Sequence, residues 1–314
     1  MTYFIGVDVS KEVLDVHIKP DELEMQFPRT SKGIRSFVKV LKRYEAILVV
    51  FEASGGYEKS LQIALRTEEI NHHVINPARV REFAKACGRF AKTDKIDARI
   101  LSLFAEKMTF YQAHQPSQEE ILLKDLVHRR RQLVEEVTRE KNRLDKAFHE
   151  VIKQDIKKHI EILCNSIEKL EQEIKRLLAS IQSLSEKVQL LVSMPGVGIT
   201  TASVLLAELP ELGQLNNKQI ASLIGVAPMS KESGKFKGAR RIMGGRASVR
   251  CTLYMSTITA IRGNPALKEF YQRLRNNGKP AKVAITAAMR KIIVTLNQMI
   301  MHRNYWNKKT SFNP

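Results

Sequence analysis

The chain has 314 residues, 43% of them hydrophobic, and a net charge of +19. Its length allows two or three domains, and its hydrophobic content excludes an intrinsically disordered protein. The three cysteines lie far apart without Cys-x-x-Cys spacing, which excludes a disulfide framework and a zinc site of that type and indicates a reducing compartment.

We expect no membrane partner, because no apolar run approaches the ~18 residues of a membrane span. The N-terminus has no basic region followed by a long apolar one, so we predict no signal peptide. The sequence therefore predicts a soluble protein of the cytoplasm.

Residues 1–115 alternate short β-rich runs with helical patterns. The predicted elements are strands at 3–9 and 14–18, a helix across 34–41, a buried strand at 46–51, a helix through 61–65 and a short strand at 73–76. Such alternation of strands and helices predicts an α/β domain.

Four acidic residues occupy positions in this domain where a carboxylate is costly unless it binds something. Asp8 interrupts the first apolar run, Glu52 ends the run 46–51, and Asp94 and Asp97 share one face if their segment is helical. A buried unpaired carboxylate costs several kcal/mol, and paired magnesium ions require acids of this kind. The pattern indicates a magnesium site for phosphoryl transfer.

The alternative is that these acids simply face water at strand ends. In that case Asp97 would pair with Arg99 or Lys95 nearby.

Residues 116–192 should form long helices, because no proline or glycine lies between Pro116 and Pro195. Apolar residues in the second half follow the alternating steps of three and four that are typical of a left-handed coiled coil over four heptads. They are Ile160, Leu163, Ile167, Leu170, Ile174, Leu177, Ile181, Leu184, Val188 and Leu191. Two partners stay open and can coexist: a second copy of the chain, or the preceding helix with Leu133, Val137, Leu144 and Phe148.

The last third of the chain, from residue 193 to 314, is predicted to be helical and is strongly basic. Residues 191–314 carry 19 Lys and Arg against 4 Asp and Glu, a net charge of +15. Such an asymmetry indicates a polyanionic partner. Nucleic acid is favoured over a membrane surface, because no amphipathic anchor accompanies the charge.

The segment 195–202 resembles the hairpin of a helix-hairpin-helix module. There, glycines such as Gly196 and Gly198 let backbone N–H groups approach a phosphate at a helix N-terminus. An ordinary tight turn between helices also needs glycine, so both interpretations stay open.

The segment 232–241 holds a serine, Ser233, among cations. Its hydroxyl is a candidate nucleophile for a phosphodiester, with neighbouring cations stabilising the developing charge. The alternative is a flexible basic loop on the DNA backbone, and Ser230 and Ser248 are competing serines. The candidate DNA-binding cations are Lys235, Lys237, Arg240, Arg241, Arg246 and Arg250.

Together these motifs resemble the DEDD-type insertion-sequence transposases, a family related to the Piv DNA invertase and including the bridge-RNA-guided recombinases. The matching stretches cover nearly the whole chain in order, and their combination is specific. They are residues 5–11, 51–57, 76–78, 92–98 and 195–198, and the block from 225–228 through Ser233-Gly234 and Arg246 to 253–255. One local departure is Met243-Gly244-Gly245, which replaces the Ser-Lys-x-Gly run of many relatives.

The resemblance implies a RuvC-like N-terminal domain with the RNase H fold (1–115), a coiled-coil connector (116–192) and a basic C-terminal transposase domain (193–314). It also implies that Asp8, Glu52, Asp94 and Asp97 bind Mg²⁺, with Mn²⁺ as a substitute, and that Ser233 forms a phosphoserine link to the cut strand. The family picture includes donor and target DNA in the bacterial nucleoid, a homodimer or homotetramer with active sites shared between subunits, and, for some members, a structured non-coding RNA.

We therefore expect a recombinase that cuts and rejoins DNA to move an insertion sequence. The alternatives are a site-specific DNA invertase, a metal-only nuclease such as a junction resolvase that uses water as the nucleophile, and a non-enzymatic binder.

Overall fold

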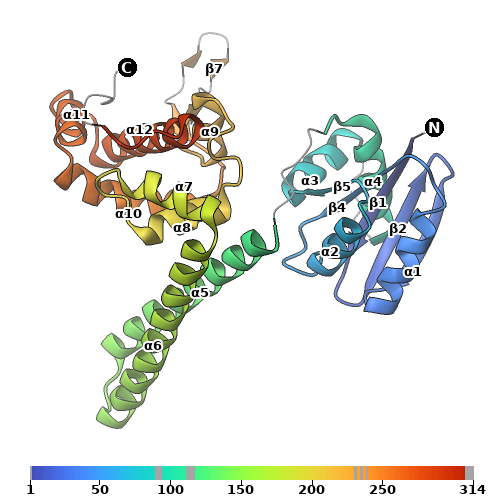
Figure 1. Cartoon of the computed structure of the whole chain (residues 1–314), viewed down its shortest axis with the longest axis horizontal. Coiled ribbons are helices and arrows are strands. Elements are labelled where there is room, and N and C mark those ends of the chain that lie inside the picture. Colours follow the sequence, from blue (N-terminus) through green and yellow to red (C-terminus); the bar gives the residue numbers. More distant parts are fainter. Residues whose placement is uncertain are drawn as a thin grey trace. The chain divides into compact units, whose positions relative to one another are not determined.

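The computed structural model describes residues 2–88, 94–110, 117–229, 232–233, 236–237 and 240–307, with the backbone alone for 94–96, 232–233 and 236–237. It divides into two compact units, residues 1–113 and residues 114–314, drawn in Figure 1.

The first unit is built on a mixed five-stranded sheet with the order β3-β2-β1-β4-β5. Strands β1 to β3 form an antiparallel meander, and β4 and β5 run parallel to β1. The strands are β1 (Tyr3–Val9), β2 (Val13–Lys19), β3 (Leu23–Pro28), β4 (Ile47–Glu52) and β5 (His72–Ile75).

Helices cover both faces of this sheet. Helices α1 (Ser31–Leu41) and α2 (Lys59–Thr67) pack with one apolar cluster, while α3 (Pro77–Ala86) and α4 (Asp94–Lys107) pack with another. The α/β class predicted for this part of the chain is therefore confirmed. The first cluster centres on Ile5, Val7, Phe37, Phe51, Leu61 and Leu65, and the second on Val50, Ile75, Val80, Leu101 and Phe104.

Strand β3 was not among the predicted strands. It is the sheet edge, and its residues are exposed or half-buried in alternation, with only Met25 and Phe27 turned to the core. An edge strand buries too little apolar surface to give a strong periodic pattern.

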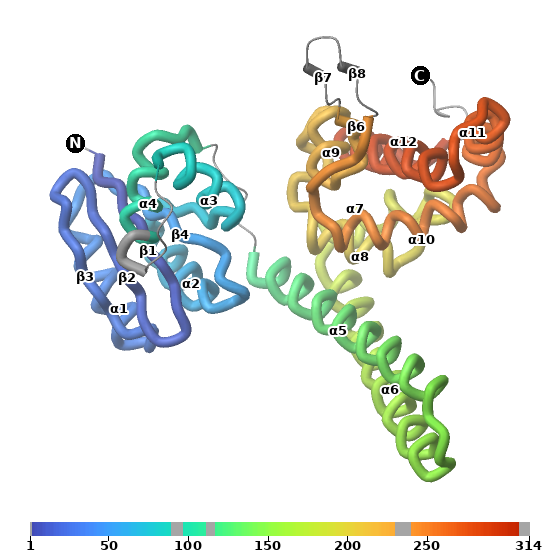
Figure 2. Tube along the Cα trace, turned by 180° about the vertical axis from the view of Figure 1, so that it is seen from behind, coloured from blue at the N-terminus to red at the C-terminus, as the bar shows by residue number. Residues whose placement is uncertain are grey.

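The second unit begins with a long helical hairpin of α5 (Gln118–Lys146) and α6 (Glu150–Ser180), which lie side by side in Figures 1 and 2. Leu133 and Val137 of α5 pack with Leu163 of α6. The predicted heptad seam thus has the preceding helix as a partner.

Two details of the coiled-coil prediction are wrong. The helix does not continue over four heptads, because α6 ends at Ser180 and Ile181 has extended backbone angles before α7 (Gln182–Val192) begins. The Ser180 hydroxyl donates to the Leu177 carbonyl at 2.9 Å and so competes for that helical acceptor. Phe148 does not join the seam: it lies in the turn between α5 and α6 and is 88% exposed.

The rest of this unit is a helical domain with one apolar core. Helices α7, α8 (Ile199–Glu208), α9 (Asn217–Leu223), α10 (Ala247–Gly263), α11 (Pro265–Asn276) and α12 (Ala281–His302) enclose that core. Two short antiparallel ribbons lie between α9 and α10 in the sequence: β6 (Pro228–Met229) with β9 (Arg241–Ile242), and β7 (Glu232–Ser233) with β8 (Phe236–Lys237).

Helix α12 has the length and hydropathy of a membrane span, contrary to the expectation that no such segment exists. Its buried residues, including Ala288, Ile292 and Leu296, lie in the core of the helical domain. Asn297 is fully buried there, accepting from Gly213 N at 2.8 Å and donating to Leu215 O at 2.7 Å. The packing is that of a core helix.

Helix α4 lies directly on the backbone of β1 at Gly6. A Cβ atom at this position would lie 2.1 Å from the Ala98 carbonyl oxygen and 2.3 Å from the Ser102 nitrogen. Both neighbours are backbone atoms of a helix, so neither can move aside alone. Glycine is therefore required at position 6 if α4 is to keep this distance from the sheet.

We predict that Gly6→Ala lowers the free energy of unfolding by about 1–3 kcal/mol, because the added methyl group overlaps α4. Urea denaturation of the full chain measures this change. Gly263→Ala is the matched control, because a Cβ there meets nothing within 4 Å. Equal stability of Gly6→Ala and the wild type would show that α4 does not press on β1.

Candidate active site

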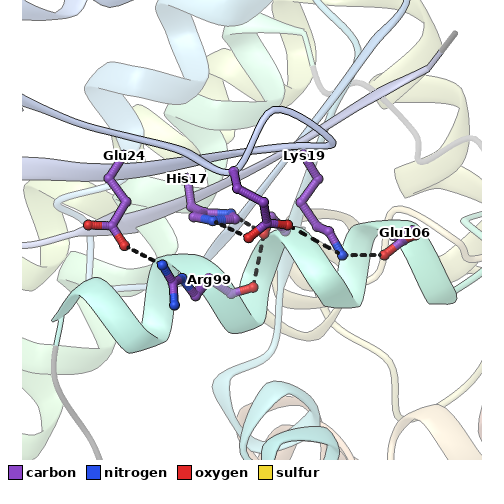
Figure 3. Close-up of polar contacts among 7 residues, drawn as sticks. His17, Lys19, Glu24, Arg99 and Glu106 are labelled. Carbon is purple, nitrogen blue, oxygen red and sulfur yellow. Dashed lines mark hydrogen bonds and ion pairs between the residues drawn. The ribbon is translucent and has the colours of Figure 1, made fainter.

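The direction of α4 follows from three polar contacts between the sheet and the helix, drawn in Figure 3. Arg99 pairs with Glu24 at 3.0 Å, the His17 ring contacts the Ser102 hydroxyl at 2.7 Å, and Lys19 pairs with Glu106 at 2.7 Å. His17 lies opposite Gly6 and Lys19 opposite Phe4. Helix α4 therefore runs antiparallel to β1, with its first turn toward the end of β1 that holds Asp8.

His17 is 1% exposed, and burial lowers the pKa of its imidazole. Its Nε2 lies 3.4 Å from a Glu22 carboxylate oxygen, which acts in the opposite direction. His17 thus serves as a largely neutral link between β2 and α4.

Asp8 and Glu52 lie beside each other on the face that α4 covers. Gly6 contacts α4, and side chains two residues apart on a strand share a face, so Asp8 points to the same side. The parallel register pairs Gly6 with Val50 and Val7 with Phe51, so Glu52 is the neighbour of Asp8. Val50 packs in the cluster that includes Leu101 of α4, which places Glu52 on that face as well.

Asp97 lies in the first turn of α4, at this same end of the sheet. Asp8, Glu52 and Asp97 are all half-buried. Asp94 begins the helix, but its side chain lies outside the described part of the chain. The fold thus brings three of the four predicted acids to one end of the layer between the sheet and α4.

No group of three His, Cys, Asp or Glu side chains that would hold a metal ion is formed among the residues that the structure describes. Arg99, one of the two cations proposed as a partner for Asp97, instead pairs with Glu24. The chemistry of the acids suits a hard divalent cation, since carboxylate oxygens are its preferred ligands.

Asp15 is a fifth acid at this end of the sheet that the sequence analysis missed. It lies directly opposite Asp8 in the antiparallel register, is 5% exposed and accepts from Gln26 Nε2 at 2.9 Å. Its signal was present: Asp15 and His17 alternate with apolar residues in the predicted strand 14–18. In a half-buried strand, polar residues at every second position share one face.

The loop after Glu52 is fixed by Glu58. One carboxylate oxygen of Glu58 accepts from Ser54 N at 3.0 Å, the Ser54 hydroxyl at 3.1 Å and Gly56 N at 2.8 Å. Burial acts to raise the pKa of Glu58, but these hydrogen bonds outweigh it and leave the pKa lowered. The charged carboxylate therefore closes the turn that follows β4 and Glu52.

The two glycines of the turn 195–198 fit different interpretations. One fits a tight turn between packed helices, and the other fits a phosphate contact at a helix N-terminus. Gly196 has φ +92° and its backbone presses on Ala260 of α10, where a Cβ would lie 2.4 Å from the alanine Cβ; its carbonyl accepts from the Ser256 hydroxyl at 2.6 Å. Gly198 caps the N-terminus of α8, is exposed, and a Cβ there would meet nothing within 4 Å. Gly196 is thus a packing residue, and Gly198 alone has the open position that a phosphate contact needs.

Ser233 lies in β7, paired with Phe236 of β8, and Lys237 ends this ribbon. Their side chains, and the whole of Ser230 and Lys235, lie outside the described residues. The competing Ser248 donates its hydroxyl to the Glu208 carboxylate. That contact gives Ser248 a packing role between α8 and α10.

Glu208 is the centre of a buried network that joins α5, α8 and α10. Its carboxylate, 10% exposed, lies 3.2 Å from Arg131 Nη1 and 3.5 Å from His128 Nε2, and also accepts from Ser248. Burial acts to raise the pKa of Glu208, but the hydrogen bonds from His128 and Ser248 and the charge of Arg131 outweigh it and hold the pKa below its ordinary value.

Arg246 belongs to the same network. Its guanidinium group donates to both carboxylate oxygens of Glu211 at 2.6 Å and to the Glu208 carbonyl at 2.7 Å. This bidentate ion pair gives Arg246 a structural role at the start of α10, whereas Arg240, Arg241 and Arg250 line a groove on this domain.

We predict that Glu208→Gln destabilises the chain by about 1–3 kcal/mol near neutral pH, since a buried carboxylate with charged donors is replaced by a neutral amide. A lowered folded-state pKa contributes stability above the ordinary pKa of 4.5, and this contribution is lost as the pH falls through the folded value. The difference in thermal midpoint between the wild type and Glu208→Gln should therefore shrink below pH 4.5.

Exposed Glu269→Gln is the control and should change the midpoint little at any pH. A difference for Glu208→Gln that grows on acidification would contradict the assigned pKa direction.

Comparison with known proteins places this arrangement in a family. A sequence model of DEDD-type IS110 transposases, described as a transposase, matches residues 5–153, and one of the transposase IS116/IS110/IS902 family matches residues 188–272. The chain is 28% identical to the pilin gene-inverting proteins of Moraxella bovis and Moraxella lacunata, over 96% of both chains in each case. It is 29% identical to the insertion element IS110 uncharacterized 43.6 kDa protein of Streptomyces coelicolor, over 47% of this chain and 38% of that protein.

The two matched regions include all the predicted acids and, separately, Ser233 and the basic segment. The DEDD-type match indicates use of a divalent metal, and the family and its relatives imply DNA as the substrate. The chain belongs to the IS110 family of transposases and is a DNA recombinase or transposase enzyme.

Proposed function

We propose that this enzyme cuts and rejoins DNA with Mg²⁺ held by Asp8, Glu52, Asp94 and Asp97 and with Ser233 as the nucleophile. The observation that carries the metal site is the convergence of β1, β4 and the first turn of α4, which gathers Asp8, Glu52 and Asp97 at one end of the sheet. Mn²⁺ fits the same oxygen ligands.

The sheet order β3-β2-β1-β4-β5, with three antiparallel strands followed by two parallel ones, supports a RuvC-like domain of the RNase H type. The N-terminus of α4 offers a second source of stabilisation for the acids, because a helix dipole contributes about 0.3–1 kcal/mol to a nearby anion. That is less than several neighbouring carboxylates require, and Asp15 adds a further one. A divalent cation compensates such a concentration of negative charge.

In the proposed reaction the bound metal would polarise the scissile phosphate. The Ser233 oxygen attacks phosphorus, its proton passes to solvent, and the bond from phosphorus to the leaving deoxyribose oxygen breaks, leaving a phosphoserine link. A second strand end reverses these steps and releases the serine. Cations of the C-terminal domain neutralise the phosphate backbone.

The proposal divides the work among three segments: a metal-binding domain at 1–115, a connector at 116–192 and a DNA-binding transposase domain at 193–314. The acids and Ser233 belong to different compact units. We propose that one active site combines the acids of one subunit with Ser233 of another, on DNA in the bacterial cytoplasm and nucleoid.

DNA inversion is the second candidate. It is favoured by the pilin gene-inverting proteins, which match 96% of the chain, whereas the IS110 protein matches 47%. Guidance by a structured RNA is a separate part of the proposal, supported by the excess of cations in the last third. Sequencing the nucleic acid that remains bound to protein purified from its native host distinguishes an RNA-guided enzyme from one that binds DNA alone.

We predict that a suicide DNA substrate traps a covalent protein–DNA adduct with the wild type and that Ser233→Ala abolishes the adduct. Asp8→Asn should abolish both cleavage and the adduct, because it removes a metal ligand. Denaturing gel electrophoresis of labelled DNA separates these outcomes.

Exposed Ser222→Ala is the control and should leave the adduct unchanged. An adduct that persists in Ser233→Ala would refute the serine role. Cleavage without any adduct in the wild type would favour the water-dependent nuclease.

The tip of the α5–α6 hairpin is the proposed contact between subunits. Phe148, Val151 and Ile152 are 88%, 77% and 52% exposed and lie within five residues of one another. Contiguous exposed apolar side chains of this kind mark interaction sites. The α5–α6 seam is filled within one chain, and the tip has the two most exposed of the hairpin's large apolar side chains, Phe148 and Val151.

We predict that Phe148→Asp combined with Val151→Asp converts the homodimer or homotetramer to a smaller species, measured by light scattering during size-exclusion chromatography. Met255→Asp, at another exposed apolar residue, is the control and should keep the wild-type mass. An unchanged mass for the tip variant would place the subunit contact elsewhere.

A further inference from the structure

The C-terminal helical domain contains a groove of about 640 Å³ beside the β6–β9 ribbon. Its walls come from α10, from the first half of α12 and from residues at both ends of the segment that carries Ser233. Pro228 of β6 pairs with Ile242 of β9, so the chain enters and leaves the Ser233 segment at the edge of this groove.

The charged side chains that line the groove are all cationic: Arg240, Arg241, Arg250, Lys282 and Arg290. Within the described part of the chain, no acidic side chain pairs with Arg240, Arg241, Lys282 or Arg290. Arg250 is held in position, since its Nη1 donates to Gly244 O at 2.6 Å and to Ile224 O at 3.3 Å. The hydrogen bond to Gly244 also gives a local role to the segment Met243-Gly244-Gly245, which replaces the Ser-Lys-x-Gly run of many relatives: its backbone holds Arg250. Five cations without a lining acid favour a phosphate-bearing ligand.

The groove is apolar between these cations. Tyr254 is half-buried, Met289 is 2% exposed on its floor, and Val283 and Ile242 keep 52% and 40% of their surfaces exposed. A DNA duplex presents phosphates and sugars to such a surface and keeps its bases stacked inside. An unpaired strand presents base faces as well, which pack on aromatic and apolar side chains while cations hold its backbone.

We propose that this groove binds single-stranded DNA, with a base against Tyr254 and Val283 and the backbone phosphates on Lys282, Arg290 and the three arginines. This inference rests on the proposed function only in taking DNA as the substrate of the domain. It adds α12 to the DNA-binding surface and gives the groove a role: it keeps an unpaired strand at the base of the Ser233 segment.

The first test compares Lys282→Ala/Arg290→Ala with the wild type by fluorescence anisotropy. The full chain is titrated with a short labelled single strand, with the matched duplex and with RNA of the same sequence, without divalent metal. We expect the variant to bind the single strand about tenfold more weakly, and the slope of log affinity against log salt to fall by about 1.4, for two lost phosphate contacts. Its duplex affinity should change less than about twofold.

Arg262→Ala/Lys268→Ala removes two exposed cations outside the groove and is the charge-matched control, expected to change affinity for the single strand less than about twofold. An equal loss in both double variants would overturn the proposal in favour of a general electrostatic effect. If Lys282→Ala/Arg290→Ala lost as much affinity for the duplex as for the single strand, the groove would be assigned to paired DNA. If the wild type bound RNA more tightly than DNA and only this variant weakened RNA binding, the groove would be assigned to RNA. Either result would overturn the assignment to single-stranded DNA.

The second test concerns the base contact. Tyr254→Leu should weaken binding of the intact strand, and an abasic site in the oligonucleotide should weaken binding of the wild type, each by about tenfold. The two losses should not add, because they remove one contact. Fully additive losses would overturn the contact with Tyr254.

Thermal melting checks that each variant folds. Lys282 is exposed and Arg290 half-buried, and neither is among the buried residues of α12, so the core should be kept. Because binding is measured without metal, failure of the cleavage chemistry in the adduct experiment leaves this result standing, and failure here leaves the chemistry untouched.

Discussion

The close contact between α4 and the backbone of β1 at Gly6 is the constraint on which the acid site depends. It sets the distance of the helix from the sheet, and three polar pairs along α4 fix its direction. Together they place the first turn of α4 over the ends of β1 and β4. Asp97 then lies near Asp8 and Glu52 for geometric reasons, although these residues are far apart in the sequence.

The C-terminal domain is organised by charge in a different way. Two of its four acids are used internally: Glu208 and Glu211 bind Arg131, Arg246, His128 and Ser248 at the junction of α5, α8 and α10. With those acids engaged, the groove cations Arg240, Arg241, Lys282 and Arg290 have no acidic partner within the described part of the chain. The last third therefore carries a net charge of +15 although its packing contains ion pairs.

Much of the first unit was predictable, because buried strands and helix faces leave strong periodic patterns. Asp8 and Glu52 were recognised since each interrupts or ends such a pattern. Asp15 was overlooked because the alternation of polar and apolar residues in β2 does not show which residues of β1 lie opposite. The antiparallel register places Asp15 opposite Asp8. The edge strand β3 was missed because it buries little apolar surface.

In the second unit, the sequence predicted the apolar seam but not its break. Spacing cannot reveal that the backbone turns at Ile181 while the side chains keep their heptad order. Spacing also does not reveal that Glu211 binds Arg246. Nor does it reveal that Lys282 and Arg290 of α12 line one groove with Arg240 and Arg241. In both cases the fold brings together segments that are far apart in the sequence.

The position of Mn²⁺ in crystals of the full chain, located by its anomalous scattering, tests the acid site most directly. We predict a peak between the carboxylates of Asp8, Glu52 and Asp97, and loss of that peak in Asp8→Asn. A peak at another cluster, or an unchanged peak in Asp8→Asn, would contradict the proposal that β1, β4 and α4 build the metal site.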